Sequence, residues 1–173
     1  MRMTSPGRNS KPPKNISVVL FSVGRRQLAA RAEEVGGIWP WTSTTAVPSG
    51  TTFVHAIIRR GDEIMPVYDM ADRLQVEVDG SNRLCLIAKR HDGPMALCID
   101  GVIPTLHVLD PESIRSARGS EADVEGTCRI GEHEVPIYSL VNLGLSPHEA
   151  PPIGAQTAQV LMSRRAYAED SGC

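Results

Sequence analysis

The chain has 173 residues, a formal net charge of −2 at pH 7 and 41% apolar residues. That charge gives no general attraction to nucleic acid or to an anionic membrane, and 4% aromatic residues supply no stacking platform for single-stranded nucleic acid. No apolar run approaches the length of a membrane-spanning helix, so we expect no direct membrane insertion. The apolar content predicts a folded protein with one compact domain or two small ones.

The two ends of the chain differ in composition from its middle. Residues 1–15 are polar, basic and rich in proline, which predicts a flexible arm. The first apolar run, 16–23, is too short and too polar for the apolar stretch of a signal peptide, so the sequence predicts a cytoplasmic protein. Residues 146–173 contain several prolines and only a weak helical pattern, which predicts a poorly ordered tail.

Between the ends, strand signals dominate. Short apolar runs bounded by turn residues predict strands at 16–23, 27–32, 38–41, 53–58, 63–68, 84–88, 95–99, 102–108, 124–130 and 134–139. The polar stretch 77–82 contains Asp79-Gly80, and we expect it to separate two modules. Cys85, Cys98, Cys128 and Cys173 show no metal-ligand spacing, so we expect free thiols.

One segment occurs twice, with an offset of 70 residues. Residues 59–70 read RRGDEIMPVYDM, and residues 129–140 read RIGEHEVPIYSL. Pro66 and Pro136 fall inside the two apolar runs, and since proline cannot donate to a strand ladder, both belong at sheet edges or at a barrel bend. The repeat, the short strands and the frequent turns predict an all-β fold of two small barrels, about 16–76 and about 83–145.

A set of motifs in a fixed order carries a resemblance to a known family. Residues 16–145 resemble the chemotaxis coupling proteins, the CheW-like domain family, over about three quarters of the chain. The matching segments are Val18–Ile38, Val47-Pro48, Arg60-Gly61 with Ile64–Met70, Ala96–Val102, and Val124-Glu125-Gly126 with Glu134–Leu140. The chain departs from the family at four places. His55 and Ala96 stand where glycine is usual, Ile58-Arg59 stands where Asn-Leu is usual, and the turn has one more residue before Pro66 than the usual pattern.

The resemblance implies a fold and a function. The fold is a pseudo-symmetric pair of five-stranded barrels of the Src-homology-3 type, without catalytic activity or a cofactor. The family bridges methyl-accepting chemoreceptor tips and the CheA-type histidine kinase. The kinase's regulatory domain associates with it barrel to barrel, and the receptor's helical hairpin lies in an apolar groove between the barrels.

The same resemblance implies two binding sites. Expected kinase contacts surround the first repeated turn: Arg59, Arg60, Gly61, Asp62 and His55. Expected receptor contacts line the groove: Val35, Ile38, Leu84, Leu86, Ala96 and Cys98. Gly61 is also expected to supply a positive φ angle at the turn.

Other functions have less support in the residues. His55, His91, His107, His133 and His148 are scattered, and none accompanies a nucleophile motif, so we expect no enzyme activity. Two alternatives stay open beside the chemotaxis adaptor. One is an adaptor of a related surface-motility or gene-control pathway. The other is a β-barrel regulator that binds a small ligand or a metal, which an apolar pocket with convergent polar groups would favour.

Overall fold

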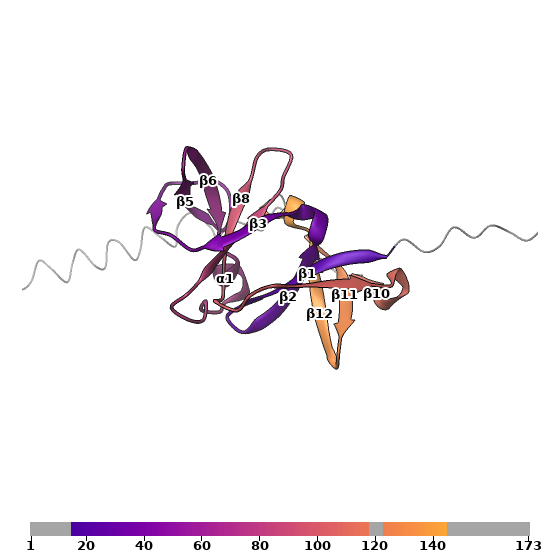
Figure 1. Ribbon diagram of the computed structural model, residues 1–173. Coiled ribbons are helices and arrows are strands. Elements are labelled where there is room, and N and C mark those ends of the chain that lie inside the picture. Colours follow the sequence, from indigo (N-terminus) through magenta and orange to yellow (C-terminus); the bar gives the residue numbers. More distant parts are fainter. Residues whose placement is uncertain (1–14, 118–122, 145–173) are drawn as a thin grey trace, which may run out of the picture.

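The computed structural model describes residues 15–117 and 123–144, and their strands form two sheets (Figure 1). In order across it, sheet A contains β10 (Ile114–Ser116), β11 (Val124–Ile130), β12 (His133–Tyr138), β2 (Arg26–Arg31), β1 (Ile16–Val23) and β9 (Thr105–Leu109). Sheet B contains β3 (Val35–Pro40), β7 (Leu84–Ala88), β8 (Met95–Ile99), β6 (Glu63–Tyr68), β5 (Val54–Arg60) and β4 (Thr44–Ala46). The predicted all-β fold with two packed β-modules is confirmed.

A three-residue strand, β10 or β4, extends one edge of each sheet to six strands. The helical elements are short: α1 (Met70–Leu74) and the 3-10 turns η1 (Ala32–Glu34), η2 (Pro111–Ser113) and η3 (Leu140–Asn142). No helix within 15–117 and 123–144 is long and apolar enough to cross a membrane. The predicted arm, apart from Asn15, and the predicted tail lie outside the described residues.

The sequence repeat is a structural repeat. Hairpins β5–β6 and β11–β12 have the same strand lengths and the same offset of 70 residues. Each has a bulge at its start, between Val54 and Ala56 in one and between Val124 and Gly126 in the other. Each second strand then joins a neighbouring strand in parallel, β6 with β8 and β12 with β2. The two sheets are therefore copies of one motif.

The two repeated prolines lie just before the parallel ladders, where the missing proline N–H removes no hydrogen bond from the parallel pairing. The parallel pairing of β6 with β8 begins at Val67, one residue after Pro66, and that of β12 with β2 begins at Ile137, one residue after Pro136. Because proline has no N–H to donate, each parallel ladder starts only after it. Both prolines thus stand immediately before the first pair of a parallel ladder.

The barrels do not correspond to the two halves of the sequence, and the expected division at 16–76 and 83–145 is wrong. Strand β3 leaves the first half and pairs with β7 in sheet B, while β9 leaves the second half and pairs with β1 in sheet A. The stretch 77–82 connects α1 to β7, and its Asp79 accepts a hydrogen bond from Arg25 at the β1–β2 turn of sheet A, so it does not separate two barrels. The physical reason is that the two crossovers, through η1 and through residues 100–104, carry the chain over to the opposite sheet.

Three apolar clusters fill the molecule. The largest lies between the sheets and takes its side chains from both; we call it the central core. It includes Phe21 and Leu28 of sheet A, and Leu86 and Leu97 of sheet B. A second cluster fills sheet B, around Met65 and Ile87, and a third fills sheet A. The sheets thus share the central core, as expected for two modules that are each too small to be stable alone.

Buried carboxylates bind the crossovers to the sheets. Glu34 of η1 accepts a hydrogen bond from the Leu140 N–H at 2.6 Å, and burial raises the pKa of its carboxyl group. Asp100, which is 2% exposed, follows β8 and accepts from the N–H groups of Gly24, Arg25 and Asp79 at 2.9, 2.8 and 2.7 Å. These bonds join segments that are distant in the sequence, and each carboxylate supplies an acceptor to backbone N–H groups that lie outside the strand ladders.

Candidate functional site

The tip of hairpin β5–β6 is a charged turn that faces solvent. Arg59, Arg60, Gly61 and Asp62 are all exposed. Gly61 has φ +59°, as predicted, and a side chain there would meet no atom within 4 Å. The Arg59 Nε donates to the Gly61 carbonyl at 2.9 Å, and the Arg59 guanidinium lies 3.9 Å from the Asp62 carboxylate. The tip is therefore held by its own short-range contacts and leaves a cationic surface open to a partner.

Arg60 also contacts a residue that the sequence analysis did not select. Its guanidinium carbon lies 3.4 Å from the ring centroid of Trp39 on β3, in a cation–π contact. Below this pair is a hollow of about 340 Å³, which we call the barrel mouth of sheet B. It is lined by Trp39, Pro40, Thr42, Ile58, Arg59, Arg60, Gly61, Met65, Cys85 and Ile87. An exposed tryptophan beside two arginines is a typical composition for a binding surface.

The equivalent mouth of sheet A has different chemistry. A hollow of about 430 Å³ lies beside the tip of β11–β12 and is lined by Glu112, Ser113, Arg115, Thr127, Cys128, Arg129, Glu132 and Glu134. Gly131 repeats the turn geometry with φ +61°. No aromatic side chain lines this hollow, and three of its residues are glutamates. The two sheets thus have hollows at equivalent positions, and the hollow of sheet B is the one lined by an aromatic ring and by arginines without a carboxylate.

The fifth expected kinase contact, His55, lies away from the tip. It is the extra residue of the β5 bulge, because Val54 pairs with Tyr68 and Ala56 pairs with Val67. Its side chain is exposed, and its carbonyl accepts from the Val47 N–H at 3.0 Å. Four residues of extended strand lie between it and Arg60, which places the two about 16 Å apart along β5. The structure therefore does not bring His55 and the arginines together.

The register of sheet B corrects the expected receptor groove. Leu84 and Leu86 pair with Ile99 and Leu97 and face the central core, whereas Ala96 pairs with Ile87 and faces the interior of sheet B. Cys98 pairs with Cys85 and shares that second face. The two expected pairs thus point in opposite directions. In addition, Leu86 and Ala96 are 0% exposed, so both are core residues and cannot contact a partner.

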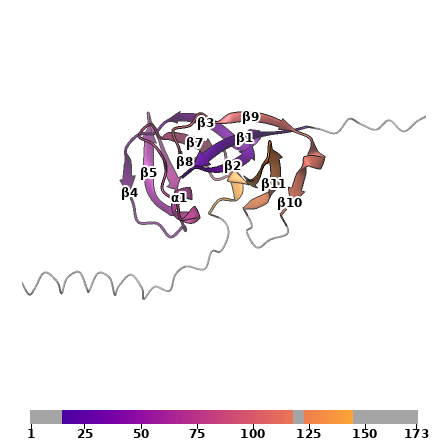
Figure 2. The same cartoon turned by 90° about the horizontal axis from the view of Figure 1, so that it is seen from below.

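Val35, Ile38 and Leu84 remain as groove candidates. All three are half-buried and lie on the face of sheet B that meets the central core. On the matching face of sheet A, Val19 pairs with Leu106, and Val108 follows two residues later. Leu106 and Val108 are 65% and 62% exposed. We call these six residues the junction strip; β3 and β9, which carry four of them, lie along the same side of the molecule (Figure 2).

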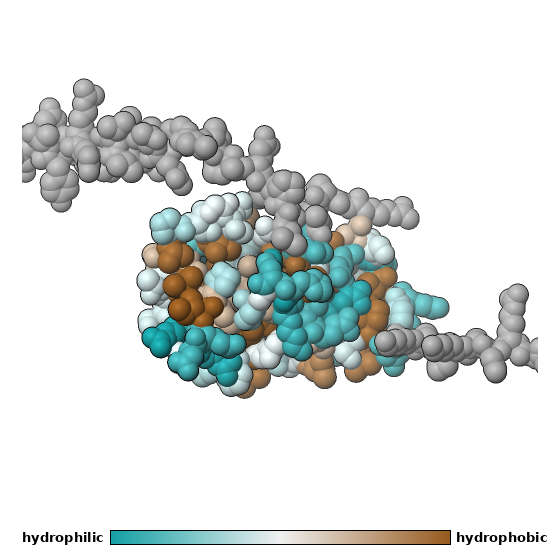
Figure 3. Space-filling view, turned by 90° about the horizontal axis from the view of Figure 1, so that it is seen from above, coloured by the Kyte–Doolittle hydropathy of each residue, from teal (hydrophilic) through white to brown (hydrophobic). Residues whose placement is uncertain are grey.

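Exposed apolar side chains continue next to the junction strip. Val102 and Ile103, in the crossover that precedes β9, are among the most exposed large apolar residues of the described chain. Figure 3 shows a different face, on which apolar surface gathers over the sheet B end and polar surface occupies the middle. Contiguous apolar side chains in solvent commonly mark a protein–protein interface.

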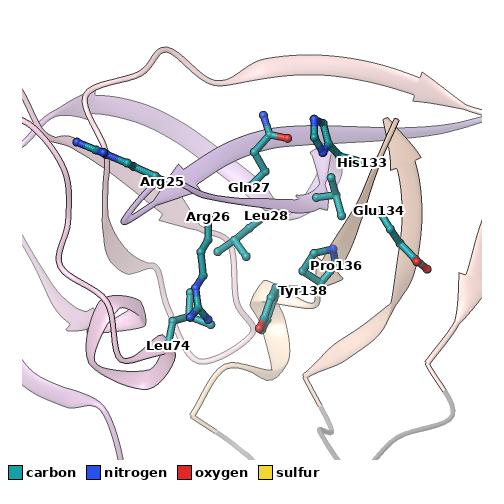
Figure 4. A pocket seen from close by; sticks show the side chains of 10 residues that line it. Arg25, Arg26, Gln27, Leu28, Leu74, His133, Glu134, Pro136 and Tyr138 are labelled. Carbon is teal, nitrogen blue, oxygen red and sulfur yellow. The ribbon is translucent and has the colours of Figure 1, made fainter. Parts of the chain in front are cut away.

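A further cleft lies where β2 and β12 separate beside α1. Its volume is about 470 Å³, and its lining includes Arg26, Leu28, Leu74, Pro136 and Tyr138. Figure 4 shows these side chains around the opening, with Glu134 directed away from it. The cleft exists because Pro136 precedes the parallel pairing, so the two strands diverge there.

Metal-ligating side chains do not converge in the part of the chain that the structure describes, which contains no group of three or more His, Cys, Asp or Glu side chains arranged to hold an ion. His148 and Cys173 lie outside this part. Cys85, Cys98 and Cys128 are free thiols.

Comparisons with known proteins agree on the fold. A family model described as the CheW-like domain matches residues 17–144. Among solved structures, the scaffolding protein CheW from Thermoanaerobacter tengcongensis is similar, with a TM-score of 0.64 and 21% sequence identity. The similarity covers 75% of this chain and 92% of that one. No curated protein matches the chain.

Proposed function

Because the chain belongs to the CheW-like domain family, we propose that it is a non-catalytic adaptor that couples methyl-accepting chemoreceptors to a CheA-type histidine kinase. The observation that carries the proposal is the match of the family to residues 17–144, which span both sheets. The two surfaces described above suit two different partners, one cationic and aromatic and the other apolar. An adaptor needs such a pair, because it must hold both partners at once.

The barrel mouth of sheet B suits the kinase. Arg59 and Arg60 present positive charge to a partner surface, and the Trp39 ring offers an aromatic anchor beside them. Charges at the rim of an interface mainly affect association rate and specificity. His55 would contribute only if the interface extended along β5. The sheet A mouth, with its glutamates, would not serve a partner selected for the cationic mouth.

The junction strip suits the receptor. A receptor tip is a helical hairpin, and an amphipathic helix binds by laying its apolar stripe against apolar side chains. Val35, Ile38 and Leu84 on one sheet and Val19, Leu106 and Val108 on the other provide such side chains at the edge of the central core. We place the protein in the cytoplasm, recruited to receptor arrays, where weak contacts act together through their high effective concentration.

The kinase surface is tested by a pair of charge reversals at equivalent turns. Arg60→Glu should weaken binding to the CheA-type kinase about tenfold, while Arg129→Glu, at the tip of the other hairpin, should leave it unchanged. Both side chains are exposed, so the melting temperature of each variant should stay within a few degrees of the wild type. Equal effects of the two variants would reject the barrel mouth as the kinase site.

The receptor surface is tested on one strand. Leu106→Asp should abolish binding of a receptor cytoplasmic fragment, whereas Thr105→Asp, an exposed neighbour on the opposite face of β9, should not. Circular dichroism controls for folding, and kinase binding should survive in both variants. Persistent receptor binding by Leu106→Asp would show that the receptor lies elsewhere.

The small-ligand alternative has one observation in its favour, the cleft beside α1. Apolar Leu28, Leu74 and Pro136, with Arg26 as a cationic partner, could hold an apolar carboxylate. A ligand-dependent rise in melting temperature that Arg26→Ala removes would support this second function. An adaptor of a surface-motility or gene-control pathway would have the same two surfaces. Neighbouring genes for a CheA-like kinase and a methyl-accepting receptor would favour chemotaxis.

A further inference from the structure

Two of the free cysteines face each other across neighbouring strands. Cys85 on β7 and Cys98 on β8 are direct Cα partners in an antiparallel ladder, and both side chains lie on the face of Ile87 and Ala96. Directly opposed residues in such a ladder have Cα atoms about 4.5–5.5 Å apart. A disulfide requires about 4.4–6.8 Å. The backbone therefore already holds the spacing that a disulfide needs.

The surroundings of the pair support the same conclusion. Cys85 is 3% exposed, whereas Cys98 is half-buried and so has one side open to solvent. The two thiols are close enough that Cys85 contributes electrostatically to the pKa of Cys98. Cys128, by contrast, is buried in the interior of sheet A, opposite Ile114 and Val135, neither of which is a cysteine.

We propose that Cys85 and Cys98 form a cross-strand modification site, which a peroxide oxidises reversibly to a disulfide. The thiolate of the half-exposed Cys98 attacks a peroxide oxygen, the O–O bond breaks and, for hydrogen peroxide, one water leaves, so that Cys98 becomes a sulfenic acid. The Cys85 thiolate then attacks the Cys98 sulfur and releases a second water. Two thiols lose two electrons and two protons in total, and hydrogen peroxide is reduced to two waters.

The reaction should be slow at neutral pH and faster in alkali. Burial raises the pKa of both thiols to about 11, and Arg83 partly opposes this shift at Cys98. Only on the order of one thiol in ten thousand is then ionised at pH 7, and the thiolate is the reacting species. The oxidation rate should rise about tenfold for each pH unit between 7 and 10.

Oxidation would also alter the barrel mouth. Cys85 lies between Cys98 on one side and Trp39 on the other, because Trp39 of β3 is its second Cα partner. Cys85 lines the mouth beneath Trp39 and Arg60. A disulfide would turn its sulfur toward β8 and change the contacts of the Trp39 ring. The disulfide itself would form whether or not the protein binds a kinase.

The test uses the full chain treated with hydrogen peroxide, and mass spectrometry as the first measurement. Peptide mapping should find Cys85 joined to Cys98 with a loss of about 2 Da, restored by dithiothreitol. Cys98→Ser should abolish this product, while Cys128→Ser and Cys173→Ser should retain it. A bridge to Cys128 or Cys173, or sulfinic acid at Cys98 without any bridge, would overturn the proposal.

Tryptophan fluorescence gives an independent measurement of the same event. Oxidation should change the emission of the wild type reversibly, and Trp39→Phe should remove most of that change while leaving the disulfide detectable by mass. An identical fluorescence change in Cys98→Ser would show that the emission follows some other oxidation, and the link between the cysteine pair and the barrel mouth would be wrong.

Discussion

Replacing Asp100 with alanine should destabilise the protein by about 2–4 kcal/mol. The carboxylate accepts three backbone N–H bonds, from Gly24, Arg25 and Asp79, and is 2% exposed. A buried donor that loses its acceptor costs about 1–3 kcal/mol. These donors are only partly buried, so water can replace some of the lost bonds, and the expected total lies near 1 kcal/mol for each.

Urea unfolding followed by circular dichroism measures the effect, with Asp62→Ala as the matched control. Asp62 is exposed at a hairpin tip and makes only a long contact with Arg59, so its removal should change stability by less than about 0.5 kcal/mol. A loss below about 1 kcal/mol for Asp100→Ala would refute the reasoning. It would mean that water replaces the carboxylate as the acceptor for all three N–H groups at little cost.

Three further predictions concern the burial of Glu34, the turn at Gly61 and the C-terminal segment. Because burial raises the pKa of Glu34 above its ordinary value of 4.5, its ionisation opposes folding, and its contribution to stability falls as pH rises from 4.5 through the folded pKa. Glu34→Gln keeps an acceptor for the Leu140 N–H and should remove this pH-dependent loss of stability. Urea titrations of both proteins at pH 4.5 and pH 7 measure the difference, and an equal loss of stability in the two proteins would contradict the prediction. Gly61→Val should cost about 1–2 kcal/mol in thermal unfolding because φ is +59°, whereas Gly50→Ala, where φ is not positive, should cost nothing. Removing residues 146–173 should leave the melting temperature nearly unchanged, because the described core lies before residue 145; a drop of many degrees would show that this segment packs on the sheets.

The local features of this protein could be predicted from its sequence, whereas the pairing of distant strands could not. The hairpin around Gly61 was predictable because its turn, its strands and its repeat at Gly131 are all encoded within a dozen residues. The partner of β3 was not, since an apolar strand pairs equally well with any free edge. For the same reason, alternation identified two faces for Leu84 and Ala96, but only the register between β7 and β8 shows that these faces are opposite.

In the candidate sites, too, the local features could be predicted from the sequence and the contacts between distant strands could not. Arg59 and Arg60 were predictable as an exposed cationic tip, because a hairpin turn is solvated. Trp39 was not connected to them, since its contact with Arg60 depends on β3 joining sheet B. For Leu106 and Val108 the sequence predicts a strand and nothing more. Nothing in their own sequence shows that β9 is the last strand of a sheet and leaves them in solvent.

The exchange of β3 and β9 has a consequence for the order in which the chain can fold during synthesis. Sheet B is assembled from one continuous stretch, 35–99, and its strands are all available before sheet A can be completed. Sheet A contains the first two strands of the chain and the last four. Strand β1 therefore cannot pair with β9 until the C-terminal part of the chain has been made. Long-range closure of this kind slows folding. We therefore expect the amides of β6–β8 to gain protection in pulsed hydrogen exchange before those of β1 and β9. Simultaneous protection would show that β1 has another pairing partner before β9 is available. Until β9 is made, the apolar edge of β1 stays without its native partner, which makes the newly made chain vulnerable to aggregation at its N-terminal strand.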